Sequence, residues 1–179
     1  MKDMEMSLVK TESHSTDHTQ SLVSDCTVFA CSYSGGNYFG DLAVFLANKV
    51  NVEYVLIGHL ENENKHKVST VALYAHGKLV NNMTYALPGT PCENVVGRNC
   101  CYYPAAVQQM FPTDQELKDL NIHSYIGSPL FDSNRNPLGI IVLMSTTTIR
   151  NAGMIEKALT ALAPRTELEM EKVLKGAGA

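Results

Sequence analysis

Residues 124–144 read SYIGSPLFDSNRNPLGIIVLM, and this stretch decides the fold. Its second half, residues 138–144, is the most apolar part and is rich in β-branched residues, which predicts a central strand buried on both faces or against a helix. Residues 132–137 gather Asp, Ser, Asn and Pro, so they predict a hairpin loop. Residues 124–131 alternate loosely and predict the partner strand. The sheet therefore contains an antiparallel hairpin near the end of the chain.

Three further strands are expected upstream of this hairpin. Residues 52–60 are rich in β-branched and aromatic side chains, which is typical of a central strand. A polar turn separates them from a second strand over residues 68–74, and the two form a hairpin. Residues 79–87 predict a third strand, which Asn81 and Asn82 weaken.

Helices are expected at both ends of the sheet. Apolar residues recur at three- and four-residue steps over residues 39–50, with Asn37 as N-cap. Residues 152–175 are helical in pattern and contain Pro164. Between the two strand groups, residues 90–93 (TPCE) and 113–116 (TDQE) have capping-box patterns and predict the starts of short helices. Hairpin links dominate this order, so it predicts an antiparallel sheet with helices packed on one face.

Composition sets the class of protein. The chain has 179 residues, of which 45% are apolar and 18% charged, with a net charge of −4. This is the balance of one globular domain, and no basic stripe supports nucleic-acid binding. No apolar run approaches the roughly 20 residues that cross a bilayer, and residues 1–20 are polar, so no signal peptide is expected. A cytoplasmic protein is expected, without membrane partners and with its five cysteines as free thiols.

The domain boundaries follow from periodicity. Residues 1–30 show none and are interpreted as a mobile tail, residues 31–175 as one domain, and residues 176–179 as a C-terminal tail. His14 and His18 in the first tail have the i, i+4 spacing of metal ligands on a helix. No Cys or carboxylate ligand set accompanies them, so the preferred reading is a solvated tail and no metal site.

Motifs spread over about residues 35–175 resemble those of the GAF domain. The resemblance is to a bacterial subset found ahead of histidine kinase, PAS and diguanylate cyclase modules. The matching segments are, in order, 36–39 (GNYF) with Leu42, 54–58 (YVLIG), 85–95 (YALPGTPCENV), 101–104 (CYYP), 111–112 (FP), 124–132 (SYIGSPLFD) and 137–140 (PLGI).

The resemblance implies an α+β, GAF-like fold. A central antiparallel sheet of five to six strands would carry the N- and C-terminal helices on one face and a ligand pocket on the other. The pocket would lie under the roof segment, about residues 83–123. Position within the resemblance places nine residues around the pocket: Tyr85, Leu87, Val95, Cys100, Tyr102, Val107, Phe111, Tyr125 and Gly127.

The resemblance also implies a role. It is the sensing of an unidentified small molecule in signal transduction, as in a two-component system, with no catalytic residue and no named cofactor. The terminal helices would form a homodimer and relay binding to an output domain, such as a histidine kinase or diguanylate cyclase, in cis or in trans. Pro164 falls in the exit helix, where it would kink the helix or begin a second one.

Departures from the family's motifs narrow the range of ligand classes that are expected. The Asn-Lys-Phe-Asp-Glu signature of cyclic-nucleotide-binding members is absent, so no cyclic nucleotide is assigned. Cys92, Cys100 and Cys101 lack the neighbouring His of bilin-binding members, so no chromophore is expected. His123 would lie at the pocket edge, but a lone His is more often hydrogen-bonded than a ligand to haem or metal.

Two alternatives stay open. Free methionine sulfoxide reductases are GAF-fold enzymes that use three cysteines around the pocket. Cys92 and Cys100 lie in the corresponding region, but no cysteine lies near residues 122–124. The other alternative is a pocketless scaffold that serves dimerisation only and buries its central cluster fully.

Overall fold

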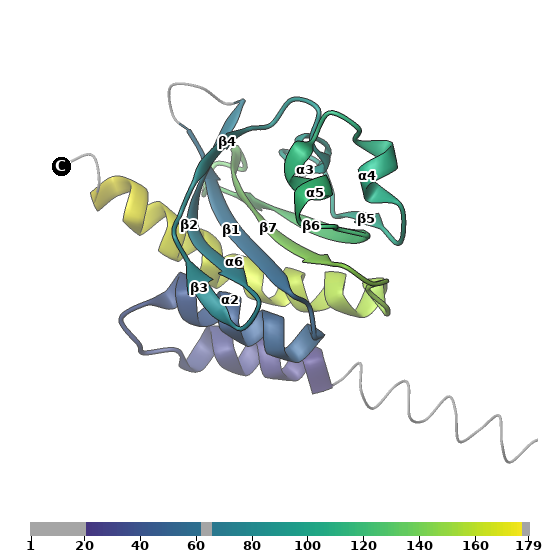
Figure 1. Cartoon of the computed structure of the whole chain (residues 1–179). Coiled ribbons are helices and arrows are strands. Elements are labelled where there is room, and N and C mark those ends of the chain that lie inside the picture. The colour runs from purple at the N-terminus through teal and green to yellow at the C-terminus, as the bar shows by residue number, and fades with distance from the viewer. Residues whose placement is uncertain (1–20, 62–65, 177–179) are drawn as a thin grey trace, which may run out of the picture.

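The fold was described from a computed structural model, which covers residues 21–61 and 66–176. Three layers are stacked: a helical layer, a sheet, and the roof segment (Figure 1). Within the described residues the sheet has seven strands in the order β3-β2-β1-β7-β6-β5, and β4 also pairs with β2. The strands are β1 Tyr54–Leu60, β2 Lys67–Ala75, β3 Lys78–Val80, β4 Thr84–Ala86, β5 Cys101–Tyr103, β6 Ser124–Phe131 and β7 Pro137–Ser145. All pairs are antiparallel, as the hairpin links predict.

The apolar run in the opening stretch forms the centre of the sheet. Strand β7 pairs with β6 on one side and β1 on the other. The side chains of residues 140–143 are completely buried. Ile141 and Leu143 contact the helical layer, whereas Ile140 and Val142 face the roof segment. The prediction of a central strand buried on both faces is confirmed.

The expected third strand is interrupted. Residues 79–87 supply two short strands, β3 and β4, which both pair with β2. Between them, the Asn82 side chain accepts a hydrogen bond from Thr70 Oγ1 and donates one to the Val71 carbonyl. Side-chain hydrogen bonds of this kind compete with the backbone hydrogen bonds between strands, so the expected strand is split in two. The sheet therefore has seven strands in the described part of the chain, whereas five to six were expected.

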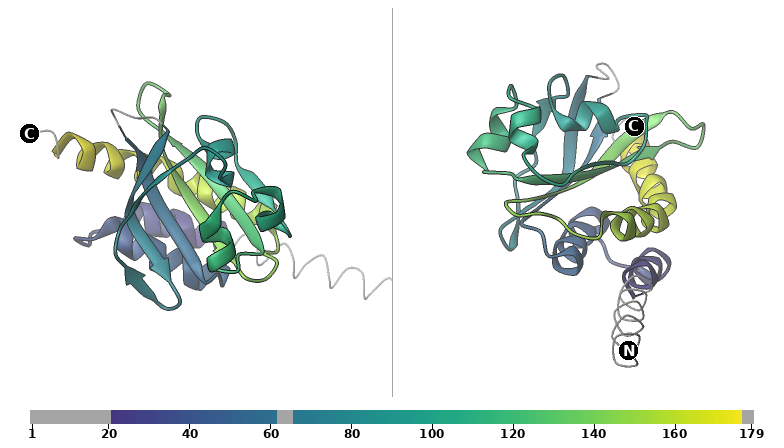
Figure 2. Two further views of the ribbon diagram at one scale, coloured as in Figure 1. Left: turned by 45° about the horizontal axis from the view of Figure 1, so that its top comes forward. Right: turned by 90° about the vertical axis from the view of Figure 1, so that its right-hand side faces the viewer.

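Three helices lie on one side of the sheet (Figure 2, right). They are the helix over residues 21–32, α2 (Tyr38–Val50) and α6 (Ala152–Gly176). Helices α2 and α6 lie against the strands, and the third helix lies on the outer side of these two. Their apolar sides and the sheet form the larger hydrophobic core. Asn37 caps α2 by accepting a hydrogen bond from the Gly40 N–H, as predicted.

The helix over residues 21–32 corrects the expected N-terminal tail. Leu22, Cys26 and Ala30 are buried in the larger core, and their spacing of four residues places them on one helix face. Val23 and Phe29 also pack against this core, so the sequence carries a helical apolar stripe here that the interpretation as a tail missed. The packed part of the chain therefore includes residues 21–30, whereas His14 and His18 lie outside the described residues.

Pro164 neither ends α6 nor begins a second helix, because α6 continues past it. Just after it, Arg165 donates to the carbonyls of Ala30 and Tyr33 at 3.3 and 3.4 Å. These bonds satisfy carbonyls at the end of the N-terminal helix, which otherwise lack helical partners. The second half of α6 is therefore tied to the N-terminal helix.

The roof segment covers the opposite face of the sheet. It contains α3 (Pro91–Val95), β5, α4 (Val107–Met110) and α5 (Gln115–Asp119), and it encloses a second, smaller core. No helix in the described ranges has both the length and the hydropathy needed to cross a membrane.

Side-chain caps start two of these short helices, though not as the full capping boxes that the sequence predicts. At α3, Glu93 accepts from the Gly89 N–H, but the Thr90 side chain does not cap. At α5 the N-cap is Asp114, one residue later than expected, and it accepts from the Leu117 N–H.

Candidate functional site

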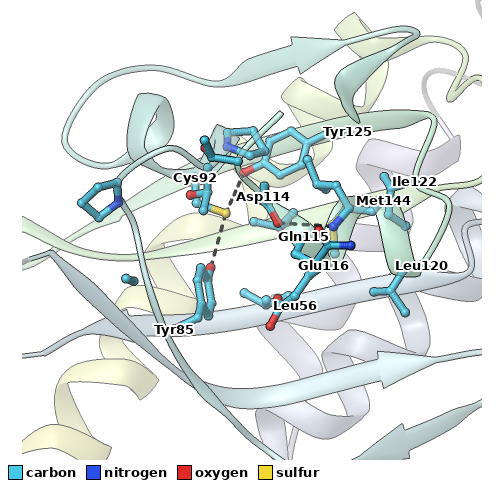
Figure 3. A pocket seen from close by; sticks show the side chains of 17 residues that line it. Leu56, Tyr85, Cys92, Asp114, Gln115, Glu116, Leu120, Ile122, Tyr125 and Met144 are labelled. Atoms are coloured by element: carbon cyan, nitrogen blue, oxygen red, sulfur yellow. Dashed lines mark hydrogen bonds between the residues drawn. The ribbon is translucent and has the colours of Figure 1, made fainter. Parts of the chain in front are cut away.

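A cavity of about 230 Å³ lies between the sheet and the roof segment (Figure 3). Strands β1, β6 and β7 form its floor through Leu56, Tyr125, Val142 and Met144. The walls come from β4 and from the residues that open α3 and α5. The rim is exposed at Leu120, whose side chain is 40% accessible. The cavity therefore forms only when six separate elements pack together.

A buried thiol lies between two tyrosines inside the cavity. The Tyr85 and Tyr125 hydroxyls each donate to Cys92 Sγ at 3.3 Å (Figure 3). Burial raises the pKa of the Cys92 thiol, although the hydrogen bonds from Tyr125 and Tyr85 act in the opposite direction. Burial also raises the pKa of both tyrosines well above the usual value. All three groups are therefore protonated near neutral pH.

The absence of a side chain at Gly127 leaves room for the Tyr125 ring. Both residues lie on the same face of β6, and a Cβ at Gly127 would lie 2.6 Å from Tyr125 Oη and 2.7 Å from Val95 Cγ2. No side chain fits there without moving the ring or α3. Gly127 thus acts on the cavity through Tyr125 and does not line it.

Two carboxylates stand in the first turn region of α5. Asp114 and Glu116 both line the cavity, with Glu116 on the exposed side. Burial raises the pKa of Asp114, against the lowering effect of its hydrogen bond from the Leu117 N–H. Partial burial raises the pKa of Glu116, and the charges of Asp114 and Asp119 raise it further. None of the cavity-lining residues is Lys, Arg or His.

The structure brings most of the nine expected pocket residues to the roof side of the sheet. Tyr85 and Tyr125 line the cavity. Leu87, Val95 and Val107 are buried in the smaller core behind it, and Phe111 packs against that core. These four support the walls and do not reach the cavity.

Cys100 and Tyr102 lie on the other side of the sheet, and their assignment to the pocket is corrected. Cys100 packs against the larger core, and the Tyr102 hydroxyl donates to the Ile149 carbonyl. Cys101 and Tyr103 face the roof side instead. Side chains alternate along a strand, so a shift of one residue exchanges the two faces.

Sequence reasoning missed the residues that supply the cavity's charge. The pattern TDQE predicts only the start of a helix. A carboxylate that caps a helix and a carboxylate that faces a ligand cannot be told apart in the sequence. Cys92 and Glu116 reach the cavity because α3 and α5 both lie over the roof-side face of the sheet, and Figure 3 shows both side chains at the cavity. Among the described residues no group of three or more His, Cys, Asp or Glu is arranged to hold a metal.

Thiol reactivity provides a first prediction. Burial raises the pKa of Cys26 and of Cys100 to about 12 and raises that of Cys92, whereas Cys31 is exposed. We expect Ellman's reagent at pH 8 to modify Cys31 fastest and to leave Cys26 and Cys92 unreacted until the protein unfolds, because the thiolate is the reactive form.

The measurement is absorbance at 412 nm, with labelled peptides identified by mass spectrometry. Cys31→Ser is the control, and it should remove the fast phase. Fast modification of Cys92 in the folded protein would contradict its placement between Tyr85 and Tyr125.

Comparison with known proteins agrees with this architecture. No protein-family model matches the chain. Among curated proteins, hybrid signal transduction histidine kinase F of Dictyostelium discoideum is 25% identical over 135 residues. That alignment covers 75% of this chain and 11% of the kinase, so the chain spans about a tenth of that relative's length.

Solved structures show the same fold. The A. aeolicus NLH2 GAF domain has a TM-score of 0.65 at 12% identity, covering 88% of this chain and 98% of that one. The GAF domain of Acinetobacter phosphoenolpyruvate-protein phosphotransferase has a TM-score of 0.67 at 11% identity, with 90% and 98% covered. Free methionine-R-sulfoxide reductase from Neisseria meningitidis has a TM-score of 0.60 at 15% identity, with 88% and 87% covered. The chain has a GAF fold.

Proposed function

We propose that this chain is the small-molecule-sensing regulatory domain of a signal transduction protein. The observation that carries the proposal is the cavity, which combines an apolar floor with a few convergent polar groups, as ligand sites do. It lies on the sheet face opposite the terminal helices, so a ligand and an output partner would use separate surfaces. The similarity to part of a histidine kinase supports a signalling context.

A physical connection links the cavity to α6. Strands β6 and β7 carry Tyr125, Val142 and Met144 on the cavity floor, and their connecting loop is held by α6. The Phe131 N–H donates to Glu167 Oε1 at 2.9 Å, and the Ser133 N–H donates to Glu171 Oε1 at 2.7 Å. A ligand that shifts the floor strands would change these bonds and bias α6, which is the form that coupling between sites requires.

The terminal helices would carry the signal outward. Val28, Leu168 and Val173 are large apolar side chains that remain exposed on them. A homodimer through this surface, together with an output domain such as a histidine kinase or diguanylate cyclase in cis or in trans, completes the proposal.

The proposal predicts that closing the cavity abolishes ligand-induced stabilisation. A metabolite screen by melting temperature should yield a ligand that, at about 100 times its Kd, stabilises the fold by about 2.7 kcal/mol. For a domain of this size that is a shift of about 5–10 °C. Leu120→Trp at the rim should remove the shift, because the larger ring fills the opening.

Met110→Trp is the matched control, since Met110 is exposed in the roof segment but does not line the cavity. It should leave the shift unchanged. Hydrogen exchange should also slow in the β6–β7 loop and α6 on binding, and Glu167→Gln with Glu171→Gln should weaken that response. Stabilisation that survives Leu120→Trp would place the ligand elsewhere and sink the proposal.

The reductase alternative depends on a nucleophilic thiolate. Of the five cysteines, all within the described residues, Cys92 alone lines the cavity. Its raised pKa opposes the thiolate that attacks a sulfoxide. The thiol-reactivity measurement described above therefore also distinguishes a sensor from a reductase. The presence of the cavity argues against a pocketless scaffold.

A further inference from the structure

The hydroxyl groups of the cavity direct their protons into the protein. Tyr85 and Tyr125 both donate to Cys92 Sγ at 3.3 Å. A phenolic hydroxyl has a single proton, so each of these oxygens retains only its capacity to accept. Cys92 adds only a weak donor.

The threonines of the walls behave in the same way. Thr90 Oγ1 donates to the Leu87 carbonyl at 2.7 Å, and Thr113 Oγ1 donates to the Gly89 carbonyl at 3.3 Å. All four hydroxyls that line the cavity have therefore used their protons within the protein. The Gln115 amide also lines the cavity, and it donates to Asp119 Oδ1 at 2.8 Å. The hydroxyls of the cavity therefore offer acceptors, which complement a ligand rich in donors.

The charged side chains of the cavity also favour a ligand with hydrogen-bond donors. Asp114 and Glu116 line the cavity, and among the described residues no Lys, Arg or His lines it to balance them. The pKa of each is raised by burial, and Glu116 is raised further by its acidic neighbours. Burial disfavours the ionised forms, and a positive ligand group would offset that cost by pairing with them.

Volume limits the size of that ligand. A water molecule occupies about 30 Å³ in the liquid, so about 230 Å³ holds about eight water-sized groups. The apolar floor of Leu56, Val142 and Met144 suits a hydrocarbon or ring, and the Tyr85 and Tyr125 rings favour a cation near their faces.

We infer that the cavity binds a small organic cation, an ammonium or guanidinium compound of about eight non-hydrogen atoms whose charged group meets Asp114 and Glu116. This inference rests on the proposed sensing function and names its ligand class.

Three probes with the same six-carbon chain test the charge directly: hexylammonium, hexan-1-ol and hexanoate. Each is titrated into the whole chain, and binding is followed by amide chemical shifts of the cavity residues. Hexylammonium should bind about tenfold more tightly than hexan-1-ol, because hydrogen bonds to charged groups are about twice as strong as neutral ones. Hexanoate should bind least.

Charge-neutral variants test the two carboxylates. Asp114→Asn keeps an N-cap for α5, since Asn caps as well as Asp, and Glu116→Gln is isosteric. The double variant should lose the tenfold preference for hexylammonium over hexan-1-ol. Asp119→Asn is the control, because it removes one negative charge from α5 at a residue that does not line the cavity.

The outcomes separate this inference from the proposed function. If hexan-1-ol or hexanoate shifts the cavity residues as strongly as hexylammonium, the cavity binds ligands but the cation class is wrong. If Asp119→Asn removes the preference as completely as the double variant, the specific role of Asp114 and Glu116 is wrong. If none of the three probes perturbs the cavity residues, the cation inference fails, whereas the sensing function is tested separately by the metabolite screen with Leu120→Trp.

Discussion

Gly139→Ala is expected to destabilise the protein by about 3 kcal/mol or more. Gly139 lies opposite His59 where β7 pairs with β1, in the centre of the sheet. A Cβ at this position would lie 2.2 Å from the Gly58 carbonyl oxygen and 3.1 Å from the His59 Cα. These are backbone atoms of a buried strand, so no side-chain rotation relieves the contact and the two strands must separate.

The measurement is urea unfolding followed by circular dichroism, with the midpoint and slope compared to the wild type. Gly153→Ala is the control, because a Cβ there meets nothing within 4 Å and the residue lies in α6. It should stabilise by about 0.5–1 kcal/mol, since Ala is the better helix former. An unchanged midpoint for Gly139→Ala would contradict the register of the central strands.

Tyr125→Ala is the second large effect, with an expected loss of about 3 kcal/mol. Tyr125 is completely buried, and its ring lies 5.9 Å from that of Tyr103, centroid to centroid. Truncation removes this packing and the donor to Cys92, and it enlarges the cavity beneath the roof segment.

Two variants divide the effect of Tyr125→Ala into its parts. Tyr125→Phe keeps the ring and should lose about 1 kcal/mol for the hydrogen bond. Tyr102→Ala removes a ring from the exposed side of the neighbouring strand and should cost less than Tyr125→Ala, because Tyr102 is 36% accessible. Thermal and urea unfolding measure all three. Equal losses for Tyr102→Ala and Tyr125→Ala would contradict the assignment of faces along β5 and β6.

Local patterns predicted the elements well. The apolar run over residues 138–144 identified the central strand, because a strand covered on both faces needs apolar side chains at every position. Asn37 identified the start of α2, because a capping side chain acts on its own first turn. Each of these two signals is contained in a few consecutive residues, so it can be recognised without the tertiary structure.

Three features depended on contacts between distant segments. The helix over residues 21–32 is held by α2 and α6, because its apolar stripe finds its packing partners only on those distant helices. Strand β5 has three residues, too few for alternation to show which face Cys101 presents. The break between β3 and β4 depends on where Asn82 meets β2.

The sequence by itself determined the order of the elements from α2 to α6 apart from the split third strand, the central hairpin and the resemblance to GAF domains, because periodicity, capping and turn formation are local properties. Only the tertiary structure decided which side chains share the cavity. Tyr85, Cys92, Asp114 and Tyr125 come from four elements separated by as many as 40 residues. The hydroxyl oxygens of Tyr85 and Tyr125 can only accept hydrogen bonds from a ligand, because both protons are donated to Cys92. Folding alone brings Cys92 within reach of both tyrosines.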